Sequence, residues 1–451
     1  MAECSPAREV VIALQEALEH AASQYDDDAE DDAHRNLAKS LVQIIDLYSA
    51  AIPRLKLRRK TATETIDPLL QEITRVVNLA NSNCARDDGR EVLSAVARLA
   101  SSTSRWIDSL KVDRAAADEA KRRMSQALED ALSSCSGSIQ SALSQRTFNE
   151  LYPRLARMSG PLPDGWEEGA DVVKSASTSH EALNGATHPS TASIASLILS
   201  SHSADTPTAT TLSSAMPALI TSLQTNIALD ESLALLLRVL SQPNVTIYPD
   251  QLFPLSTLLP TVASMHPDPT IRHISFRVLS LLLRAAPSHV RLDILKELTA
   301  DESLPQMMVA AIGLVKEAFL EGLNNGDTDV LGSKRALQEL GATVLRTNPP
   351  DLLEGVDKEK FLESVEPRRL TEILSLVYVL LNRDTENQTG IRDKDTLRAL
   401  EANILKPLRT RLAEWMNGGD GEGHDHDMMS LVGLSISLER VDATISGLST
   451  S

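Results

Sequence analysis

Apolar residues recur at helical spacing in two neighbouring stretches between Pro267 and Leu323. In the first stretch the recurring positions are Ile271, Ser275, Val278, Leu279 and Leu282. In the second, about 36 residues further along the chain, they are Met307, Ala311, Leu314, Val315 and Ala318. Each set places an apolar stripe along one face of a helix. The pattern therefore predicts two amphipathic helices of one repeat type.

Both predicted helices have a small residue at the same place in the pattern. These residues are Ser275 and Ala311, and a short side chain lets a neighbouring helix approach closely. A fixed offset between helices, with no strand pattern between them, is typical of proteins built from stacked helical repeats. We therefore expect an all-α fold, an α-solenoid in which antiparallel helix pairs form a superhelical stack.

The same periodicity divides the chain into blocks. Residues 1–158 are predicted to form an N-terminal helical block. Residues 159–214, rich in Ser, Thr and Ala, are expected to be a linker or mobile loop with one short helix. This stretch separates either two structural units or two segments of one solenoid. Residues 215–417 form the helical repeat block, residues 418–427 a Gly/His/Asp loop, and residues 428–451 a C-terminal helix.

The composition agrees with helix-on-helix packing. Hydrophobic residues make up 42% of the chain but aromatic residues only 3%, so that the cores must consist mainly of Leu, Ile, Val and Ala. Alternating β-branched patterns bounded by turn pairs are missing, which argues against a β-sandwich or barrel. Short apolar strands do not alternate with helices, which argues against a doubly wound nucleotide-binding fold.

The charge balance narrows the class of partner. The 451 residues have a net charge of −18, from 62 acidic and 44 basic side chains. An acidic surface repels nucleic-acid phosphates and anionic lipids, so we expect neither direct nucleic-acid binding nor membrane binding. The longest apolar runs, residues 233–240 and 278–283, are also too short to span a bilayer. Partners are expected to be proteins, some of them with basic patches.

Cysteine usage and the N-terminal segment indicate the compartment. The three cysteines, Cys4, Cys84 and Cys135, match no metal-ligand spacing and fit a reducing environment. Residues 1–22 are acidic and amphipathic, unlike a secretory signal. We therefore expect a cytoplasmic protein, with the nucleus as a second compartment.

One loop contains candidate metal ligands. Residues 419–427 hold His424 and His426 close to Glu422, Asp425 and Asp427. Imidazole and carboxylate groups bind zinc and related ions. However, the surroundings are glycine-rich, and no further His or Cys stands at ligand spacing. We therefore expect a solvated loop without metal, and a metal-dependent enzyme is only a remote alternative.

Two charged clusters allow a functional and a structural interpretation. The basic cluster at residues 54–60 is either a nuclear-import signal or phosphate-binding patch, or an ordinary charged helix surface. The acidic run at residues 26–32 either binds a basic partner or is a solvated connector. The structural interpretation is preferred for both.

The sequence contains no recognisable catalytic constellation. It lacks a GxSxG elbow, a GxxxxGK[ST] phosphate loop and a GxGxxG turn after a strand. Cys84 lies in a polar turn without a nearby His. We therefore expect no enzyme, no catalytic, cofactor-binding or metal-binding residue, no cofactor and no small-molecule substrate.

The first predicted helix, residues 268–283, resembles a HEAT-type helix. In that pattern an acidic residue precedes a Val/Ile-Arg pair, and a small residue follows three positions later. The corresponding residues here are Asp268, Ile271-Arg272 and Ser275. Together with residues 305–318, this segment resembles the YAP-binding/ALF4/glomulin family, whose fungal members join a polar, helix-rich N-terminal half to such a paired-helix core. The rest of the chain resembles the family only in length and helical character.

The resemblance implies HEAT-like repeats that work by protein binding. Glomulin caps the RING subunit of cullin-RING ubiquitin ligases, and fungal relatives bind a stress-response bZIP transcription factor or associate with kinetochores. The resemblance thus implies a non-enzymatic adaptor or inhibitor, acting in ubiquitin-ligase regulation or in the oxidative stress response. The alternatives are an assembly chaperone of the proteasome type and a transport-type solenoid. No contact residue is implied.

Overall fold

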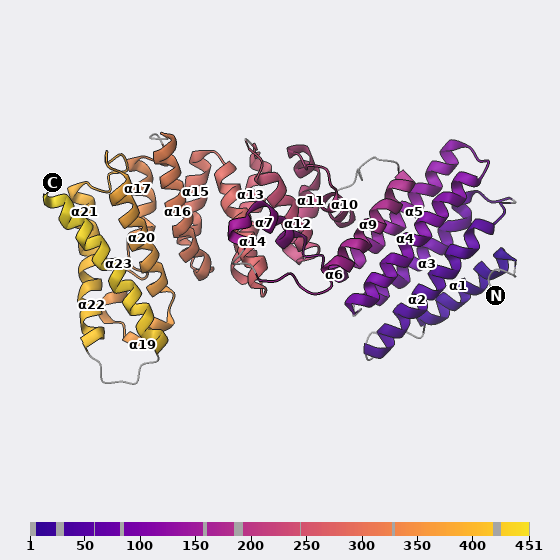
Figure 1. The fold of residues 1–451 in the computed structure, drawn as a ribbon, viewed down its shortest axis with the longest axis horizontal. Coiled ribbons are helices and arrows are strands. Elements are labelled where there is room, and N and C mark those ends of the chain that lie inside the picture. The colour runs from indigo at the N-terminus through magenta and orange to yellow at the C-terminus, as the bar shows by residue number, and fades with distance from the viewer. Residues whose placement is uncertain are drawn as a thin grey trace. The chain divides into compact units, whose positions relative to one another are not determined.

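The computed structural model describes residues 6–23, 31–57, 59–81, 85–156, 160–184, 193–243, 245–326, 330–417 and 425–450. These residues form helices joined by turns and loops, and no strand occurs among them (Figure 1). Neighbouring helices pack in pairs, which confirms the predicted all-α solenoid. The chain divides into two compact units, Met1–Val245 and Thr246–Ser451.

The N-terminal unit is a stack of helices. Its elements are α1 (Ala7–Ser23), α2 (Asp31–Ala51), the 3-10 helix η1 (Ile52–Arg54), α3 (Ala62–Asn81), α4 (Arg86–Ser109), α5 (Arg114–Ser134), α6 (Ser136–Ile139), α7 (Leu143–Leu151), α8 (Pro153–Ala156), α9 (Trp166–Asn184), α10 (Ile194–His202), α11 (Ala209–Thr225) and α12 (Leu229–Leu240).

Helix α4 lies at the centre of this unit, in contact with α2, α5 and α9 (Figure 1). Its buried side chains include Ala95, Ala97 and Ala100, which leave room for neighbours on several sides. Leu, Ile, Val and Ala supply most of the surrounding core, as the composition predicted.

The segment predicted as a linker contains more helix than expected. Instead of one short helix, residues 159–214 hold α9, α10 and the beginning of α11. Helix α9 packs on α4 and α5 through small side chains such as Val173 and Ala176. A Cβ atom at Gly169 would stand 1.9 Å from the carbonyl oxygen of Ile139, so the close packing requires glycine there. Small residues therefore mark tight helix packing in this segment, although the same composition is also typical of a linker.

The helical segment from Ser136 to Ala156 is interrupted twice. Helix α6 ends at Ile139, and α7 begins only at Leu143, after Gln140 and Ala142 adopt φ angles of 43° and 49°. The second interruption separates α7 from α8, which starts at Pro153, a residue whose ring cannot continue a helix interior.

The C-terminal unit continues with the same type of packing. Its elements are α13 (Pro249–Met265), α14 (Pro269–Ala285), α15 (Ser288–Ala300), α16 (Pro305–Asn325), α17 (Lys334–Val344), α18 (Leu352–Gly355), α19 (Lys358–Glu363), α20 (Glu366–Arg383), α21 (Lys394–Leu400), the π-helical turn η2 (Glu401–Leu405), α22 (Lys406–Asn417) and α23 (Asp425–Thr450). Contacts join α13 to α14, α15 to both α16 and α17, and α20 to both α16 and α23 (Figure 1).

The two helices predicted from periodicity are α14 and α16. All of their recurring positions are buried except Ile271, which is half-buried. The small residues Ser275 and Ala311 are both 0% exposed, as expected where helices approach closely. Helix α14 begins with Pro269 at the first helical position, and Asp268 caps it because its Oδ1 accepts a hydrogen bond from the amide of Thr270 at 2.7 Å.

Candidate functional site

Two surface grooves in the C-terminal unit form the candidate site. The first lies between α17 and the helix formed by α21 and η2, and the second lies between α13 and α15. We call them the α17–α21 groove and the α13–α15 groove. Each is built between helices that do not follow one another directly in the chain, so tertiary packing determines its shape.

A buried arginine fixes one wall of the α17–α21 groove. Arg369 of α20 is 2% exposed and donates hydrogen bonds to the carbonyl oxygens of Arg346 at 2.9 Å and Thr343 at 3.0 Å. Glu366 accepts from Arg369 at 3.2 Å and from the amide of Asn348 at 3.4 Å. Burial raises the pKa of the Glu366 carboxyl, although Arg369 opposes this shift. Together these contacts hold the end of α17 against α20.

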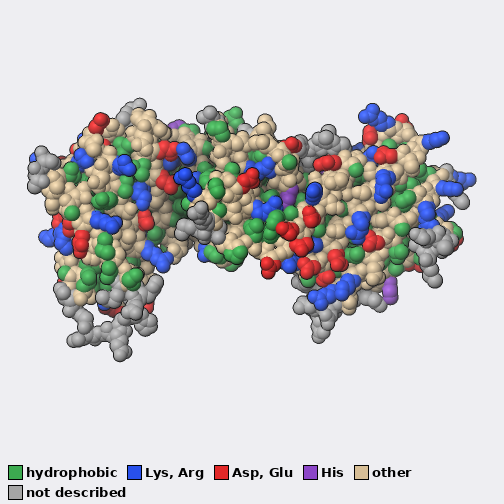
Figure 2. Space-filling view, viewed as in Figure 1, with side chains coloured by type: hydrophobic (Ala, Val, Ile, Leu, Met, Phe, Trp, Pro, Cys, Tyr) green, Lys and Arg blue, Asp and Glu red, His purple; other side chains and the backbone are tan. Residues whose placement is uncertain are grey.

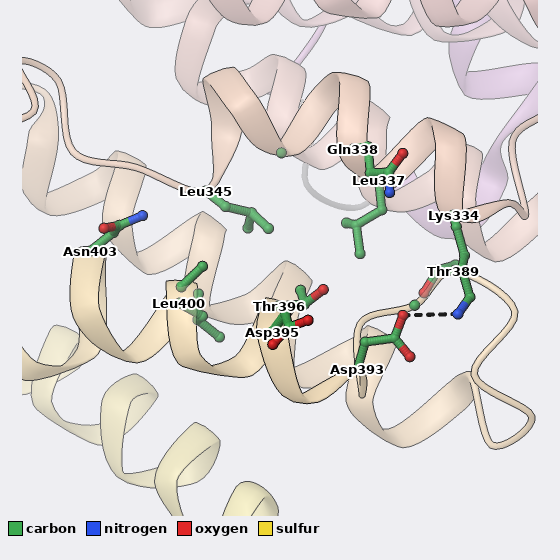
Figure 3. A pocket seen from close by; sticks show the side chains of 13 residues that line it. Lys334, Leu337, Gln338, Leu345, Thr389, Asp393, Asp395, Thr396, Leu400 and Asn403 are labelled. Carbon is green, nitrogen blue, oxygen red and sulfur yellow. Dashed lines mark hydrogen bonds and ion pairs between the residues drawn. The ribbon is translucent and has the colours of Figure 1, made fainter.

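The α17–α21 groove has an apolar floor and a volume of about 320 Å³. Leu337 and Leu345 point into it from α17 and the residue after it, and Leu400 faces them from α21 (Figure 3). Polar side chains surround this floor: Lys334, Gln338, Thr389, Asp393, Asp395, Thr396 and Asn403. Asn403 belongs to η2, and π-helical turns of this kind occur frequently at functional sites.

An ion pair closes one end of the α17–α21 groove. Lys334 Nζ lies 2.9 Å from Asp393 Oδ2, and Asn387 Nδ2 donates to Asp393 Oδ1 at 2.7 Å (Figure 3). Hydrogen bonds from Lys334 and Asn387 lower the pKa of the Asp393 carboxyl. Gly390 lies beside the pair with φ +76°, where a Cβ atom would meet Lys334 Cγ at 3.1 Å. The loop around Gly390 therefore keeps the Lys334 side chain beside Asp393.

The α13–α15 groove is larger, with a volume of about 590 Å³. Its lining combines apolar side chains, hydroxyl groups and carboxylates: Ser256, Thr257, Pro260, Thr261, Met265, Ile294, Glu297, Leu298, Asp301, Ser303 and Leu304. Neither Lys nor Arg is among them. A groove with this lining can accept apolar side chains of a partner and attract positive charge at its rim.

A separate apolar area lies near the C-terminus. Its members are Met416 of α22 and Met429, Val432 and Ile436 of α23, exposed by 42%, 71%, 38% and 44%. Figure 2 shows apolar side chains gathered over these helices, whereas carboxylates gather over the beginning of α9 in the N-terminal unit.

The predicted metal loop is only partly described. Residues 418–424, which include His424, and the side chain of His426 lie outside the described residues. Within the ranges described, no group of three or more His, Cys, Asp or Glu side chains is arranged to hold a metal ion. The side chains of residues 26–32, together with Cys4 and Cys84, also lie outside these ranges, whereas Cys135 is buried.

The described residues of the basic cluster lie mainly in a loop and not on a helix surface. Arg58 lies outside the described residues, and the other members of residues 54–60 lie between the end of η1 and the start of α3. Leu55 and Leu57 are half-buried against the core, and the carbonyl oxygen of Leu55 accepts a hydrogen bond from Trp106 Nε1 at 3.1 Å. Lys56, Arg59 and Lys60 are exposed. Two inward-facing leucines thus anchor this basic segment to the N-terminal unit.

Neither groove was predicted from the sequence. One signal was present: Phe253, Thr257, Thr261 and Met265 recur every four residues on α13, outside its buried face. The identity of the facing helix, however, depends on tertiary packing. Among the helices in the described ranges, none combines the length and the apolar character needed to cross a membrane.

Comparison with known protein families gives one match. Residues 208–443 match the model of the YAP/Alf4/glomulin protein family. The matched residues include both grooves and all helices of the C-terminal unit except the end of α23. A search of curated proteins finds no match.

Proposed function

This chain belongs to the YAP/Alf4/glomulin family of protein-binding adaptors, and we propose that it covers a functional surface of one protein partner without catalysing a reaction. The partner is either the RING subunit of a cullin-RING ubiquitin ligase or a stress-response bZIP transcription factor. Both partner classes occur in the cytoplasm or the nucleus, where we place this protein.

The observation that carries this proposal is the position of the family match. Residues 208–443 contain the C-terminal helical stack and both of its grooves. A stack of rigid helices presents an extended, preformed surface, which reduces the entropy lost on binding. Apolar anchors in such grooves supply most of the affinity, and charged rims set the orientation of the partner.

The proposed mechanism is steric. A partner held on the helical stack has its own contact surface covered, so that a third protein cannot reach it. For a RING subunit, the excluded protein is the ubiquitin-conjugating enzyme. For a bZIP factor, the covered surface is part of its basic or zipper region. The net charge of −18 favours partners with basic surfaces through long-range steering.

Purified components test the proposal directly. The full chain is mixed with a purified RING–cullin complex and, separately, with a purified bZIP protein, and each mixture is analysed by size-exclusion chromatography with light scattering. We expect a stable complex with one of them. If it forms with the RING complex, ubiquitin transfer should fall as the chain is added. Failure of both proteins to bind at micromolar concentration would contradict the proposal.

A further inference from the structure

One wall of the α13–α15 groove, formed by Thr257, Thr261 and Met265, belongs to an exposed row of side chains that continues to Phe253, beyond the groove lining. Phe253, Thr257, Thr261 and Met265 follow one another at four-residue intervals along α13. Rows of this spacing form the ridges along which helices pack. The two apolar ends, Phe253 and Met265, are 54% and 69% exposed and stand about 18 Å apart along the helix axis. Within the described residues of this unit, no helix covers either side chain.

The opposite wall of the groove is acidic. Glu297 of α15 is exposed and pairs with no other described residue, and Asp301 follows at the end of the helix. Arg291 and Lys296 of α15 pair with carboxylates outside the groove lining. Arg291 pairs with Glu321 at 2.7 Å, and Lys296 lies 3.7 Å from Glu339 of α17. The groove therefore joins a ridge with apolar ends to a rim whose charged lining residues, Glu297 and Asp301, are both negative.

The floor of the groove is apolar. Pro260, Ile294 and Leu298 are buried beneath the rim, with the hydroxyl groups of Ser256 and Thr261 beside them. Its volume of about 590 Å³ exceeds that of any single side chain. No strand edge occurs among the described residues, so a partner segment cannot add to a sheet here.

We propose that the α13–α15 groove binds a basic amphipathic helix of the protein partner. Its apolar face lies against Phe253, Met265 and the floor, and its Lys and Arg side chains face Glu297 and Asp301. This proposal rests on the proposed function, whose partner it describes chemically. A second copy of this acidic chain fits less well, because its net charge of −18 would oppose association.

A pair of designed peptides tests the proposal on the full chain. The first is a labelled, helix-forming peptide of about 18 residues with Leu on one face and Lys on the other. The second has Glu in place of every Lys. We expect saturable binding of the basic peptide by fluorescence anisotropy, and at least tenfold weaker binding of the acidic peptide at low salt.

Two matched substitutions locate the binding site. Glu297→Lys should weaken binding of the basic peptide about tenfold, whereas Glu359→Lys, at an exposed position of α19, should not. Met265→Ser should weaken it to a similar extent. Its control is Met429→Ser, because Met429 is 71% exposed and Met265 69%. Neither methionine contributes much to the core, so circular dichroism should show unchanged folding for both variants.

Absence of saturable binding, equal binding of the two peptides, or binding that neither Glu297→Lys nor Met265→Ser weakens would overturn the inference. Its failure is distinguishable from failure of the proposed function. If the RING complex or the bZIP protein binds wild type and Glu297→Lys equally, the adaptor function stands and the groove is not its site. If neither protein binds wild type, the proposed function fails, and the peptide result still decides what the groove accepts.

Discussion

At the scale of single residues, Asp230 links two helices that are far apart in sequence. It lies in the first turn of α12, but its carboxylate accepts hydrogen bonds from the amides of Leu143 at 2.6 Å and Ser144 at 2.9 Å. Ser144 Oγ donates to the same carboxylate at 2.6 Å. These amides begin α7, directly after Ala142 with its positive φ angle. Asp230 thus caps a helix about 90 residues earlier and stabilises the turn that precedes it.

We predict that Asp230→Ala destabilises the protein by about 2–3 kcal/mol, because it leaves buried amides without acceptors. The control is Asp171→Ala on the exposed surface of α9, for which a change within about 0.5 kcal/mol is expected. Urea denaturation followed by circular dichroism measures both. Equal stability of the two variants would show that the cap contributes little.

The Lys334–Asp393 pair predicts a specific pH dependence. Because the pKa of Asp393 is lowered in the folded chain, the pair contributes above the usual Asp pKa and is lost as the pH falls through the lowered native value. Lys334→Met should therefore raise the pKa of Asp393, as followed by carboxyl NMR titration. An unchanged pKa in this variant would mean that Lys334 does not hold the carboxylate.

At the scale of elements, the end of α17 depends on α20. Arg369 donates to two carbonyl oxygens near the end of α17 and contacts Glu366 within its own helix. We predict that Arg369→Met costs about 3–5 kcal/mol, because it leaves the buried Glu366 without its partner. Adding Glu366→Gln should recover about 2 kcal/mol, since the unpaired charge is then removed.

Chemical denaturation of the single and double variants tests this coupling. If the unpaired charge of Glu366 causes the loss of stability, the double variant is more stable than Arg369→Met alone. If the double variant is equally or less stable, the damage comes from the unpaired carbonyl groups of Thr343 and Arg346, and the charge of Glu366 is unimportant.

The two repeat-type helices α14 and α16 could be predicted from sequence because their apolar positions recur at the same spacing as their buried positions. Each recurring position of α16 is buried, and a small residue occupies the close contact in both helices. Helix α9 could not be predicted in the same way. Its contacts use Val173, Ala176 and Gly169, and small residues of this kind also occur in linkers.

The grooves lay beyond sequence reasoning for a different reason. Met265 and Glu297 face one groove, and Leu337 and Leu400 face another, from helices whose pairing only the tertiary structure determines. Sequence alone shows that Met265 lies outside the apolar face of its helix. It does not show which helix lies opposite. Asp230 illustrates the same limit, because its position predicts a cap for α12 rather than for α7.

At the scale of the whole molecule, the acidic charge predicts how binding responds to salt. A net charge of −18 should accelerate association with a basic partner at low ionic strength. Raising the salt from low to physiological concentration should then reduce the association rate constant about tenfold and change the dissociation rate constant much less. Surface plasmon resonance measures both rate constants, with the RING complex or the bZIP protein as the partner, whichever of them binds. A salt-independent association rate would rule out steering by charge.

Affinity purification tests whether this chain acts by binding a RING subunit or a bZIP factor. The tagged full chain is recovered at low and at moderate salt, and bound proteins are quantified by mass spectrometry against a tag-only control. We expect enrichment of a cullin-RING subunit or of a bZIP transcription factor, and we expect it to be stronger at low salt. Repeated recovery of neither, or of proteasomal ATPases or transport factors in their place, would contradict the proposed function.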